Sequence, residues 1–256
     1  MGMPRWEDFE ERIFVKRDAP RLLAHELDPA KLSGQHIAIG TATDPYQPAE
    51  RRFKVTRSIL EVLALATDLR LSITTKSDLI TRDLDVLIRI AARSALSVSL
   101  TITTLDRRLA RMLEFRAPTP DLRLEAVHAL CSAGIRAGVN IAPILPDITD
   151  SRENLEPIVA AAKRHGAVHV WGNPLFLKPC AQQAFFPFLD RHFPDLKARY
   201  AARFARSAFL NGAYRKQIVD LLTDLKTKHG FGDDPDLDPP AALHAFEPKA
   251  AQLPLL

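Results

Sequence analysis

The sequence predicts a parallel α/β fold in which short strands alternate with amphipathic helices. Segments rich in β-branched and apolar residues are followed by patterns with apolar residues three and four positions apart. The strands recur about every 30 residues, which is the usual size of a βα unit. Most of them are apolar or mix apolar residues with hydroxyls, as buried parallel strands do. Five strands are expected, at 36–40, 69–76, 96–104, 138–145 and 168–175.

Helical patterns fill the spaces between these strands and carry recognisable ends. Ser77 and Ser151 stand at N-cap positions, because each directly precedes an amphipathic run. Gly134 and Gly166 stand where helices should stop. The helices are expected at 56–66, 77–94, 120–134 and 151–166.

The pattern changes after residue 180, where helical patterns follow one another with no strand between them. From Phe231 on, the sequence is rich in Pro, Asp and Ala, a composition that favours a mostly disordered tail. We therefore expect an α/β domain at 1–178, a helical C-terminal appendage at 179–230 and a disordered tail at 231–256.

The composition is that of an ordinary globular chain. Of its 256 residues, 46% are hydrophobic and 26% are charged. No apolar run reaches the roughly 18 residues of a membrane span, and the charged N-terminus lacks an apolar signal core. We therefore expect a cytoplasmic protein with no membrane partner. The net charge of +4 supports a nucleic-acid partner only weakly, because a solvated basic surface explains it as well.

Motifs for several common chemistries are absent. Cys131 and Cys180 match neither a metal spacing nor a disulfide framework, and the eight histidines form no pair at ligand spacing. The sequence holds no GxGxxG fingerprint, no P-loop, no GxSxG elbow and no HExxH pair. A dinucleotide site, a triphosphate site and a protein-ligated metal site are therefore disfavoured.

Polar residues collect where the expected strands end. Because the carboxyl ends of parallel strands meet at one edge, these side chains should lie close together. Each has a structural explanation of its own, since threonine favours strands and Asp-Pro favours turns. Together they suit a ligand that bears a carboxylate and a ribose. The candidate binding residues are Thr43, Asp44, Lys76, Thr101, Thr103, Glu114 and Arg116.

Several of these segments resemble one known family. GTATDPYQPAERR, ITTKS, VSLTITTLD, LEFRAPTPDLRLEA and IAPILP follow one another in the order and at the spacing seen there. The family is that of the radical S-adenosylmethionine (radical SAM) proteins, in its spore-photoproduct-lyase-like group. The resemblance runs from about Phe9 to Leu177, and TDPYQPxE is its most specific piece.

The resemblance implies a partial (βα)6 TIM-like barrel that here lacks its first strand. S-adenosylmethionine would lie across the strand ends. By position, Thr43 and Asp44 would contact its methionine part, and Lys76 matches the family's cofactor-binding lysine. Thr101 would face the ribose with Thr103 beside it, which suits the donors and acceptors of a diol. Glu114 and Arg116 match a Glu-x-Arg element near the same ligand, and residues 141–146 would line the adenine.

One departure from the family pattern concerns the [4Fe–4S] cluster. Family members hold it with three cysteines of a CxxxCxxC loop after the first strand, and this chain has two cysteines and no such loop. In the family, the first strand and this loop precede a segment that resembles residues 2–23 here. We expect that the chain is truncated just downstream of the loop and inactive as written. The alternative is a natural cluster-free paralogue.

The resemblance also implies a function for the intact protein. It would cleave S-adenosylmethionine reductively to a 5′-deoxyadenosyl radical that abstracts a hydrogen atom, and a lyase-like activity on nucleic-acid lesions follows from the family alone. The alternative is a non-catalytic module that binds S-adenosylmethionine or a protein or nucleic-acid partner. An unpaired edge at residues 36–40 would favour self-association.

Overall fold

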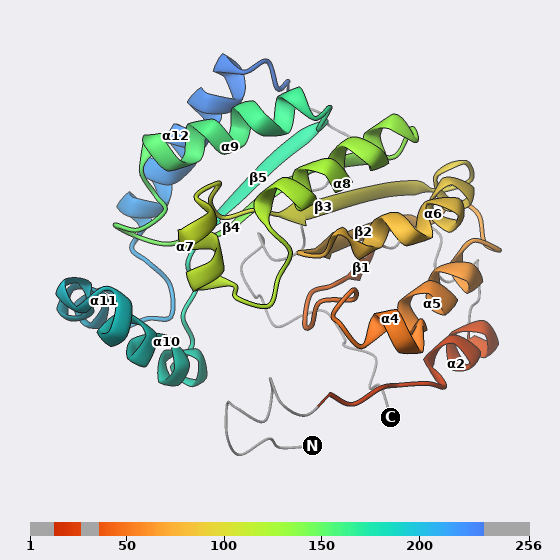
Figure 1. Ribbon diagram of the computed structural model, residues 1–256, viewed down its shortest axis with the longest axis horizontal. Coiled ribbons are helices and arrows are strands. Elements are labelled where there is room, and N and C mark those ends of the chain that lie inside the picture. Colours follow the sequence, from red (N-terminus) through yellow and green to blue (C-terminus); the bar gives the residue numbers. More distant parts are fainter. Residues whose placement is uncertain (1–12, 27–35, 233–256) are drawn as a thin grey trace.

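The computed structural model describes residues 13–26 and 36–232. Strands and helices alternate along the chain, with the strands on one side and most helices layered in front of them (Figure 1). The strands are β1 (His36–Ile39), β2 (Arg70–Thr75), β3 (Ala95–Thr101), β4 (Arg136–Ile144) and β5 (His169–Pro174). The helices before β4 are α2 (Ala19–Glu26), α4 (Glu50–Phe53), α5 (Val55–Leu63), the 3-10 helix η1 (Asp78–Asp83), α6 (Leu84–Ala91), α7 (Arg107–Leu113) and α8 (Pro120–Ser132).

The helices after β4 fall into two groups. Helix α9 (Arg152–Arg164) crosses from β4 to β5, as the sequence pattern predicts. Beyond β5 come α10 (Pro179–His192), the 3-10 helix η2 (Pro194–Leu196), α11 (Lys197–Phe204) and α12 (Gly212–Lys228). Residues 233–256, most of the expected disordered tail, lie outside the described residues.

The five strands form one parallel sheet in the order β1-β2-β3-β4-β5. Each strand pairs with the next one along the chain, so Ile39 lies opposite Ile73 and Thr101 lies opposite Asn140. In the described part of the chain the sheet does not close, and β1 and β5 are its two edges. The predicted α/β class and partial barrel are confirmed.

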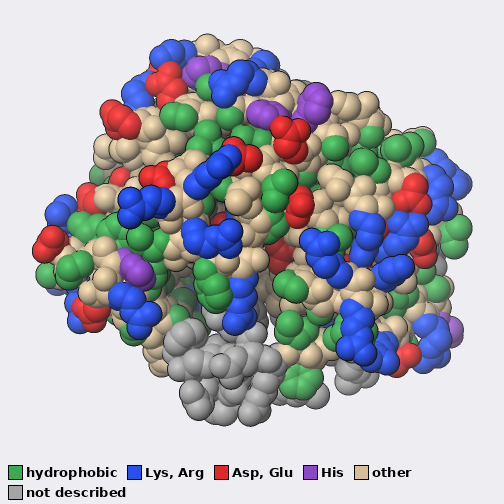
Figure 2. All heavy atoms as spheres, viewed as in Figure 1, with side chains coloured by type: hydrophobic (Ala, Val, Ile, Leu, Met, Phe, Trp, Pro, Cys, Tyr) green, Lys and Arg blue, Asp and Glu red, His purple; other side chains and the backbone are tan. Residues whose placement is uncertain are grey.

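The basic residues are not confined to one place. On the face seen in Figure 2, Lys and Arg side chains are spread over most of the surface, with apolar side chains between them. Charge alone therefore does not locate a partner surface on this face.

No helix among residues 13–26 and 36–232 is long and apolar enough to span a membrane.

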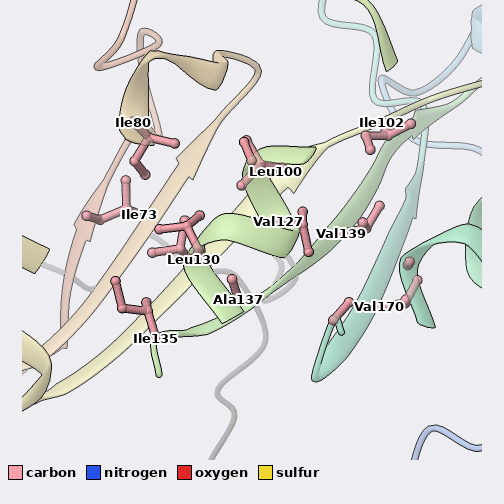
Figure 3. Close-up of a cluster of buried hydrophobic side chains, with 14 of the residues drawn as sticks. Ile73, Ile80, Leu100, Ile102, Val127, Leu130, Ile135, Ala137, Val139 and Val170 are labelled. Atoms are coloured by element: carbon pink, nitrogen blue, oxygen red, sulfur yellow. The ribbon is translucent and has the colours of Figure 1, made fainter. Parts of the chain in front are cut away.

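The main core lies between the sheet and the helical layer (Figure 3). Leu100 and Val139 point from their strands toward Val127 and Leu130 of α8, and Val170 of β5 belongs to the same cluster. All five are at most 1% exposed. Burial of such a side chain stabilises the fold by roughly 1.5–3 kcal/mol. Because neighbouring residues of a strand alternate in direction, the residues between them point to the opposite face of the sheet.

The predicted helix ends are confirmed. The Ser77 hydroxyl accepts a hydrogen bond from the Leu79 N–H, and the Ser151 hydroxyl accepts one from the Asn154 N–H. Gly134 and Gly166 take φ values of 77° and 82°, in the left-handed region that ends a helix. Helix α7 was not expected from the sequence, and it is capped by the Asp106 carboxylate.

The segment after β5 does not behave as a single unit. Tyr200 and Phe204 of α11 pack with Leu189 of α10 in a second apolar cluster, beside Leu145 and other residues that follow β4 and β5. Helix α12, by contrast, contacts α9 and β5 and contributes to the main core. It therefore takes its place in the helical layer over β5. The boundary expected at 178/179 stays a prediction.

Candidate binding site at the carboxyl edge of the sheet

The Asp44 carboxylate fixes the loop that follows β1. Gly40 starts this loop at a φ of 98°, and a Cβ there would come within 2.1 Å of a backbone carbonyl of β2. Asp44 accepts hydrogen bonds from the N–H groups of Tyr46 at 2.9 Å and Lys76 at 2.8 Å. The Thr75 hydroxyl donates a third at 2.6 Å. One side chain thus ties the end of β1 to the end of β2.

Glu50 fixes the other end of the same loop. Its buried carboxylate accepts hydrogen bonds from the N–H groups of Thr56 and Arg57, at the start of α5. It also pairs with Arg82 at 2.9 Å. Arg82 and Arg57 in turn both reach the fully buried carboxylate of Asp83. Both acids of the TDPYQPAE stretch therefore have a structural role. Asp44 fixes the loop, and Glu50 fixes the start of the helix that follows.

A chain of ion pairs crosses the carboxyl ends of β2 and β3. The Lys76 ammonium lies 2.7 Å from one oxygen of Glu114, and the Arg123 guanidinium lies 2.6 Å from the other. Arg123 also donates to the Thr101 carbonyl at 2.8 Å and to the Pro118 carbonyl at 3.0 Å. We call Lys76, Glu114 and Arg123 the rim cluster. It holds the loop after β3 against the ends of the strands.

The rim cluster keeps its carboxylate ionised. Burial alone would raise the pKa of Glu114, but the charges of Lys76 and Arg123 and their hydrogen bonds outweigh it, and the pKa lies below its ordinary value. Arg123 is only 2% exposed, whereas the Lys76 side chain is 42% exposed. An ammonium has three donors, so Lys76 can bind a further acceptor while it keeps its contact with Glu114.

The face of the sheet that points away from the helical layer is polar. We call it the inner face and define it by Ser99, Thr101, Asn140, His169 and Trp171, which alternate with core residues along β3, β4 and β5. The Ser99 hydroxyl and His169 Nε2 lie 3.0 Å apart and are both buried. They belong to β3 and β5, so this contact crosses over β4.

The contact between Ser99 and His169 depends on a glycine in the strand between them. Gly138 of β4 lies opposite His169 in the register. A Cβ at Gly138 would come within 2.2 Å of the His169 carbonyl oxygen and 2.6 Å of its ring. The imidazole therefore occupies space that any other residue would fill.

Asn140 presents an open acceptor on the inner face. It is 7% exposed, and its Oδ1 has no hydrogen-bond partner among the residues that the structure describes. A buried amide oxygen without a partner costs about 1–3 kcal/mol, so such an atom usually has a role. It lies between Thr101 and Trp171 in the sheet, beside hydroxyls that suit a sugar.

A cavity of about 500 Å³ opens outside the rim cluster. Asp44 and Lys76 line it from the ends of β1 and β2, and Arg116 lines it from the loop after α7. Arg51 adds a third cation from α4. A cavity of this size suits a small polar ligand.

The structure brings most of the predicted residues to one edge. Asp44, Lys76, Glu114 and Thr101 are joined through hydrogen bonds and Arg123. Thr103 is buried two residues beyond Thr101, and Arg116 is exposed at the cavity. Thr43 is exposed in the loop and has no specific contact in the described part of the chain. Whether these seven residues bind a cofactor stays a prediction.

The sequence prediction missed Arg123, Asn140 and the Ser99–His169 pair. A signal existed for each of the first two. Arg123 stands among the apolar positions of its helical pattern, and Asn140 is the lone amide of an apolar strand. The third could not be found, because its partners are 70 residues apart and meet only across β4.

The described residues do not fit a protein-ligated cluster. A [4Fe–4S] cluster needs cysteine thiolates, and the sequence has two cysteines. Cys131 lies in α8, with its thiol 3.6 Å from the Ala137 carbonyl, and burial raises its pKa. Cys180 is exposed in α10. In the described ranges no group of three His, Cys, Asp or Glu side chains could hold a metal ion.

The fold and the site define the class of protein first. It is a partial α/β barrel with a polar site at the carboxyl edge of its parallel sheet. Residues 7–156, more than half of the chain, match the radical SAM superfamily. The chain therefore belongs to the radical SAM superfamily.

Similarity to two uncharacterised proteins extends beyond the residues of the family match. An uncharacterised protein of Mycobacterium tuberculosis is 33% identical over 246 residues, which cover 96% of this chain and 72% of that protein. An uncharacterised protein of Methanocaldococcus jannaschii is 30% identical over 183 residues, which cover 72% of this chain and 64% of that protein.

Solved structures agree on the fold. A spore photoproduct lyase mutant superposes with a TM-score of 0.58 at 14% identity, over 86% of this chain and 66% of that one. Another, which holds AdoMet and dinucleoside spore photoproduct, gives 0.58 at 13%, over 85% and 65%. The chain thus spans about two thirds of these structures. At this identity the likeness shows the fold alone.

Proposed function

We propose that the carboxyl edge of the sheet binds S-adenosylmethionine for a radical SAM enzyme. The observation that carries this proposal is Asn140, whose buried Oδ1 faces the polar inner face without a partner in the described structure. An acceptor of this kind is suited to a hydroxyl or amino group of a nucleoside. Family membership supplies the cofactor class, and one solved structure of this fold holds AdoMet.

The residues present fit this cofactor. Thr101 and Asn140 lie side by side in the sheet and would bind the ribose, with Thr103 beyond them. Lys76 would bind the methionine carboxylate through the donors that Glu114 does not use. Arg123 would not touch the cofactor, since it is enclosed by Glu114 and two carbonyl groups, and would position Glu114 instead. Bound here, S-adenosylmethionine would supply the 5′-deoxyadenosyl group for hydrogen-atom abstraction, and the described residues offer no thiolate set for the [4Fe–4S] cluster that this chemistry needs.

We propose nucleic-acid lesions as the substrate class. One spore photoproduct lyase of the same fold holds a dinucleoside photoproduct, and this likeness supports the class without identifying the lesion. The polar inner face would accept such a substrate beside the cofactor, because its hydroxyl, amide and imidazole groups can pair with base edges.

Calorimetric titration with S-adenosylmethionine tests the binding site. We expect the wild type to bind, and Asn140→Ala and Lys76→Ala each to weaken binding about tenfold, because each removes one polar contact to the ligand. Lys197→Ala is the matched control, since it breaks a comparable lysine–carboxylate pair on α11 at 2.6 Å. Absence of binding by the wild type, or equal loss in the control, would contradict the proposal.

A second candidate is a binding module without radical chemistry. The presence of only two cysteines favours it, because they cannot supply three thiolates. Anaerobic reconstitution with iron and sulfide separates the two candidates. The module predicts S-adenosylmethionine binding with no stoichiometric iron, whereas about four irons per chain, as in a [4Fe–4S] cluster, would support the enzyme.

A further inference from the structure

The segment that joins α11 to α12 is strongly basic. Residues 197–216 include six Lys or Arg side chains and no Asp or Glu, although the whole chain has a net charge of only +4. Arg199 and Arg203 pair with Asp147, which offsets part of this charge. Arg206 and Arg215 make no ion pair with any carboxylate of the described residues, so their charges remain available to a partner.

These arginines surround a hollow. A cavity of about 940 Å³ lies in the turn between α11 and α12, and its lining includes Arg203, Arg206 and Arg215. Phe209 lines the same cavity. Three guanidinium groups around one hollow suit phosphate, because each presents a planar fork of donors.

An exposed aromatic pair lies at this hollow. The rings of Phe176 and Phe209 have centroids 4.5 Å apart and planes inclined by 34°. They are 37% and 43% exposed, so their contact leaves part of both rings open to solvent. Lys178 lies 5.5 Å from the centre of the Phe176 ring. The pair therefore offers an apolar face to solvent within a cationic setting.

The aromatic pair is held in place by the backbone. Residues Phe176 and Phe209 form an antiparallel bridge, and the Leu177 N–H donates to the Ala208 carbonyl at 2.9 Å. The Ser207 hydroxyl accepts a hydrogen bond from the Phe209 N–H at 3.0 Å. A platform fixed in this way loses little conformational entropy when a ring stacks on it.

We propose that Arg206, Arg215 and the Phe176–Phe209 pair form a docking surface for single-stranded nucleic acid. Arginines in a hollow bind backbone phosphates, and exposed aromatic rings stack with unpaired bases. A carboxylate-bearing peptide would pair with the arginines, but its carboxylates would not stack on the aromatic rings. Basic side chains are spread widely in Figure 2, so it is their combination with the aromatic pair that singles out this surface.

The surface is attached to the same edge of the sheet as the candidate binding site. The Tyr200 hydroxyl donates to the Pro146 carbonyl at 2.7 Å, and Arg203 pairs with Asp147 at 2.6 Å, so α11 rests on the loop after β4. Phe176 follows the carboxyl end of β5. The inference rests on the proposed function only for its partner class, because nucleic acid bound here would lie on the edge that carries the cofactor site.

Fluorescence anisotropy with a labelled oligothymidylate of about 12 nucleotides tests the proposal without cofactor or cluster. We expect Arg206→Ala with Arg215→Ala to lower affinity at least tenfold and to reduce the salt dependence. Phe209→Ala should lower affinity about tenfold and leave the salt dependence unchanged, because stacking releases no counterions. Circular dichroism melting shows whether each variant still folds.

The matched control is Arg89→Ala with Arg93→Ala, which removes two exposed arginines beside the amino end of β3. A loss in this control equal to that of the paired variant would overturn the proposal. So would absent binding by the wild type, or equal binding of polyglutamate, which has charge without bases. A wild type that binds the oligonucleotide but not S-adenosylmethionine would keep this surface and remove the proposed cofactor site.

Discussion

At the scale of single residues, the best-defined feature is a buried arginine. Arg123 donates hydrogen bonds to one carboxylate and to two backbone carbonyls. It lies on α8 among buried positions that otherwise hold apolar residues. A buried guanidinium is tolerated only when its donors are paired, and here the pairing fixes the loop that follows β3. Its role is to position Glu114, which links it to Lys76 on the candidate site.

Replacing Arg123 by Ala should lower the free energy of unfolding by about 3 kcal/mol, because Glu114 loses one of its two charged partners in a buried setting. Urea titration measures the change. Arg107→Ala is the matched control, since Arg107 forms a similar pair with Asp121 at 2.8 Å where both side chains are exposed. That exposed pair should contribute less than about 1 kcal/mol. Equal losses in the two variants would contradict the assignment.

The rim cluster also predicts a dependence of stability on pH. The pKa of Glu114 is lower in the folded chain than its ordinary value of 4.5. The ionised carboxylate therefore stabilises the fold above that value, and this contribution is lost as the pH falls through the folded pKa. We expect the stability advantage of the wild type over Glu114→Gln to shrink below pH 4.5. Urea titrations across this range measure it, and an advantage that grows on acidification would refute it.

At the scale of elements, the edge strand β5 depends on close contact with β4. Gly138 leaves room for His169, and the Ser99–His169 hydrogen bond then spans three strands on the inner face. The loop after β1 is fixed in a comparable way, by Asp44 at one end and Glu50 at the other. The first feature holds β5 against β4 at its amino end, and the second holds the loop at the carboxyl edge, where a binding site needs a fixed frame.

Gly138→Ala should destabilise the protein by about 3 kcal/mol, because the added methyl group meets backbone and a ring rather than the end of a flexible side chain. The change in the midpoint of thermal unfolding reports it. Gly212→Ala is the control, since a Cβ there has no neighbour within 4 Å. The control should stay within about 0.5 kcal/mol of the wild type. A stable Gly138→Ala protein would show that β5 can move away from β4.

At the scale of the whole molecule, the described sheet ends in an edge at β1. Among residues 13–26 and 36–232 this strand pairs with β2 alone, and its residues are not fully buried. An edge of this kind presents backbone groups that a second chain can pair with. Self-association through β1 therefore stays a prediction.

Sedimentation velocity at increasing concentration tests self-association. We expect the average mass of the wild type to rise with concentration, and Ala38→Lys to reduce this rise, because a charge on an edge strand blocks pairing. Val219→Lys, at a side chain 54% exposed on α12, adds the same charge away from the edge and should behave as the wild type. A wild type that stays monomeric throughout would refute the prediction.

The sequence by itself determined the alternation of strands and helices, the helix caps at Ser77 and Ser151 and the family. These follow from local patterns, because periodicity, capping and motif order are written in neighbouring residues. It also predicted that Asp44, Lys76 and Glu114 lie at one edge of the sheet, because the carboxyl ends of parallel strands meet there.

Only the tertiary structure decided what these residues contact. It showed that Asp44 and Glu50 support the loop, that Arg123 is buried behind Glu114, and that α12 joins the helical layer. It also placed His169 against Ser99, and Phe176 against Phe209, across long sequence separations. The physical reason is that such contacts depend on the register of the sheet and on the space left by single side chains. Neither quantity is encoded in a local pattern.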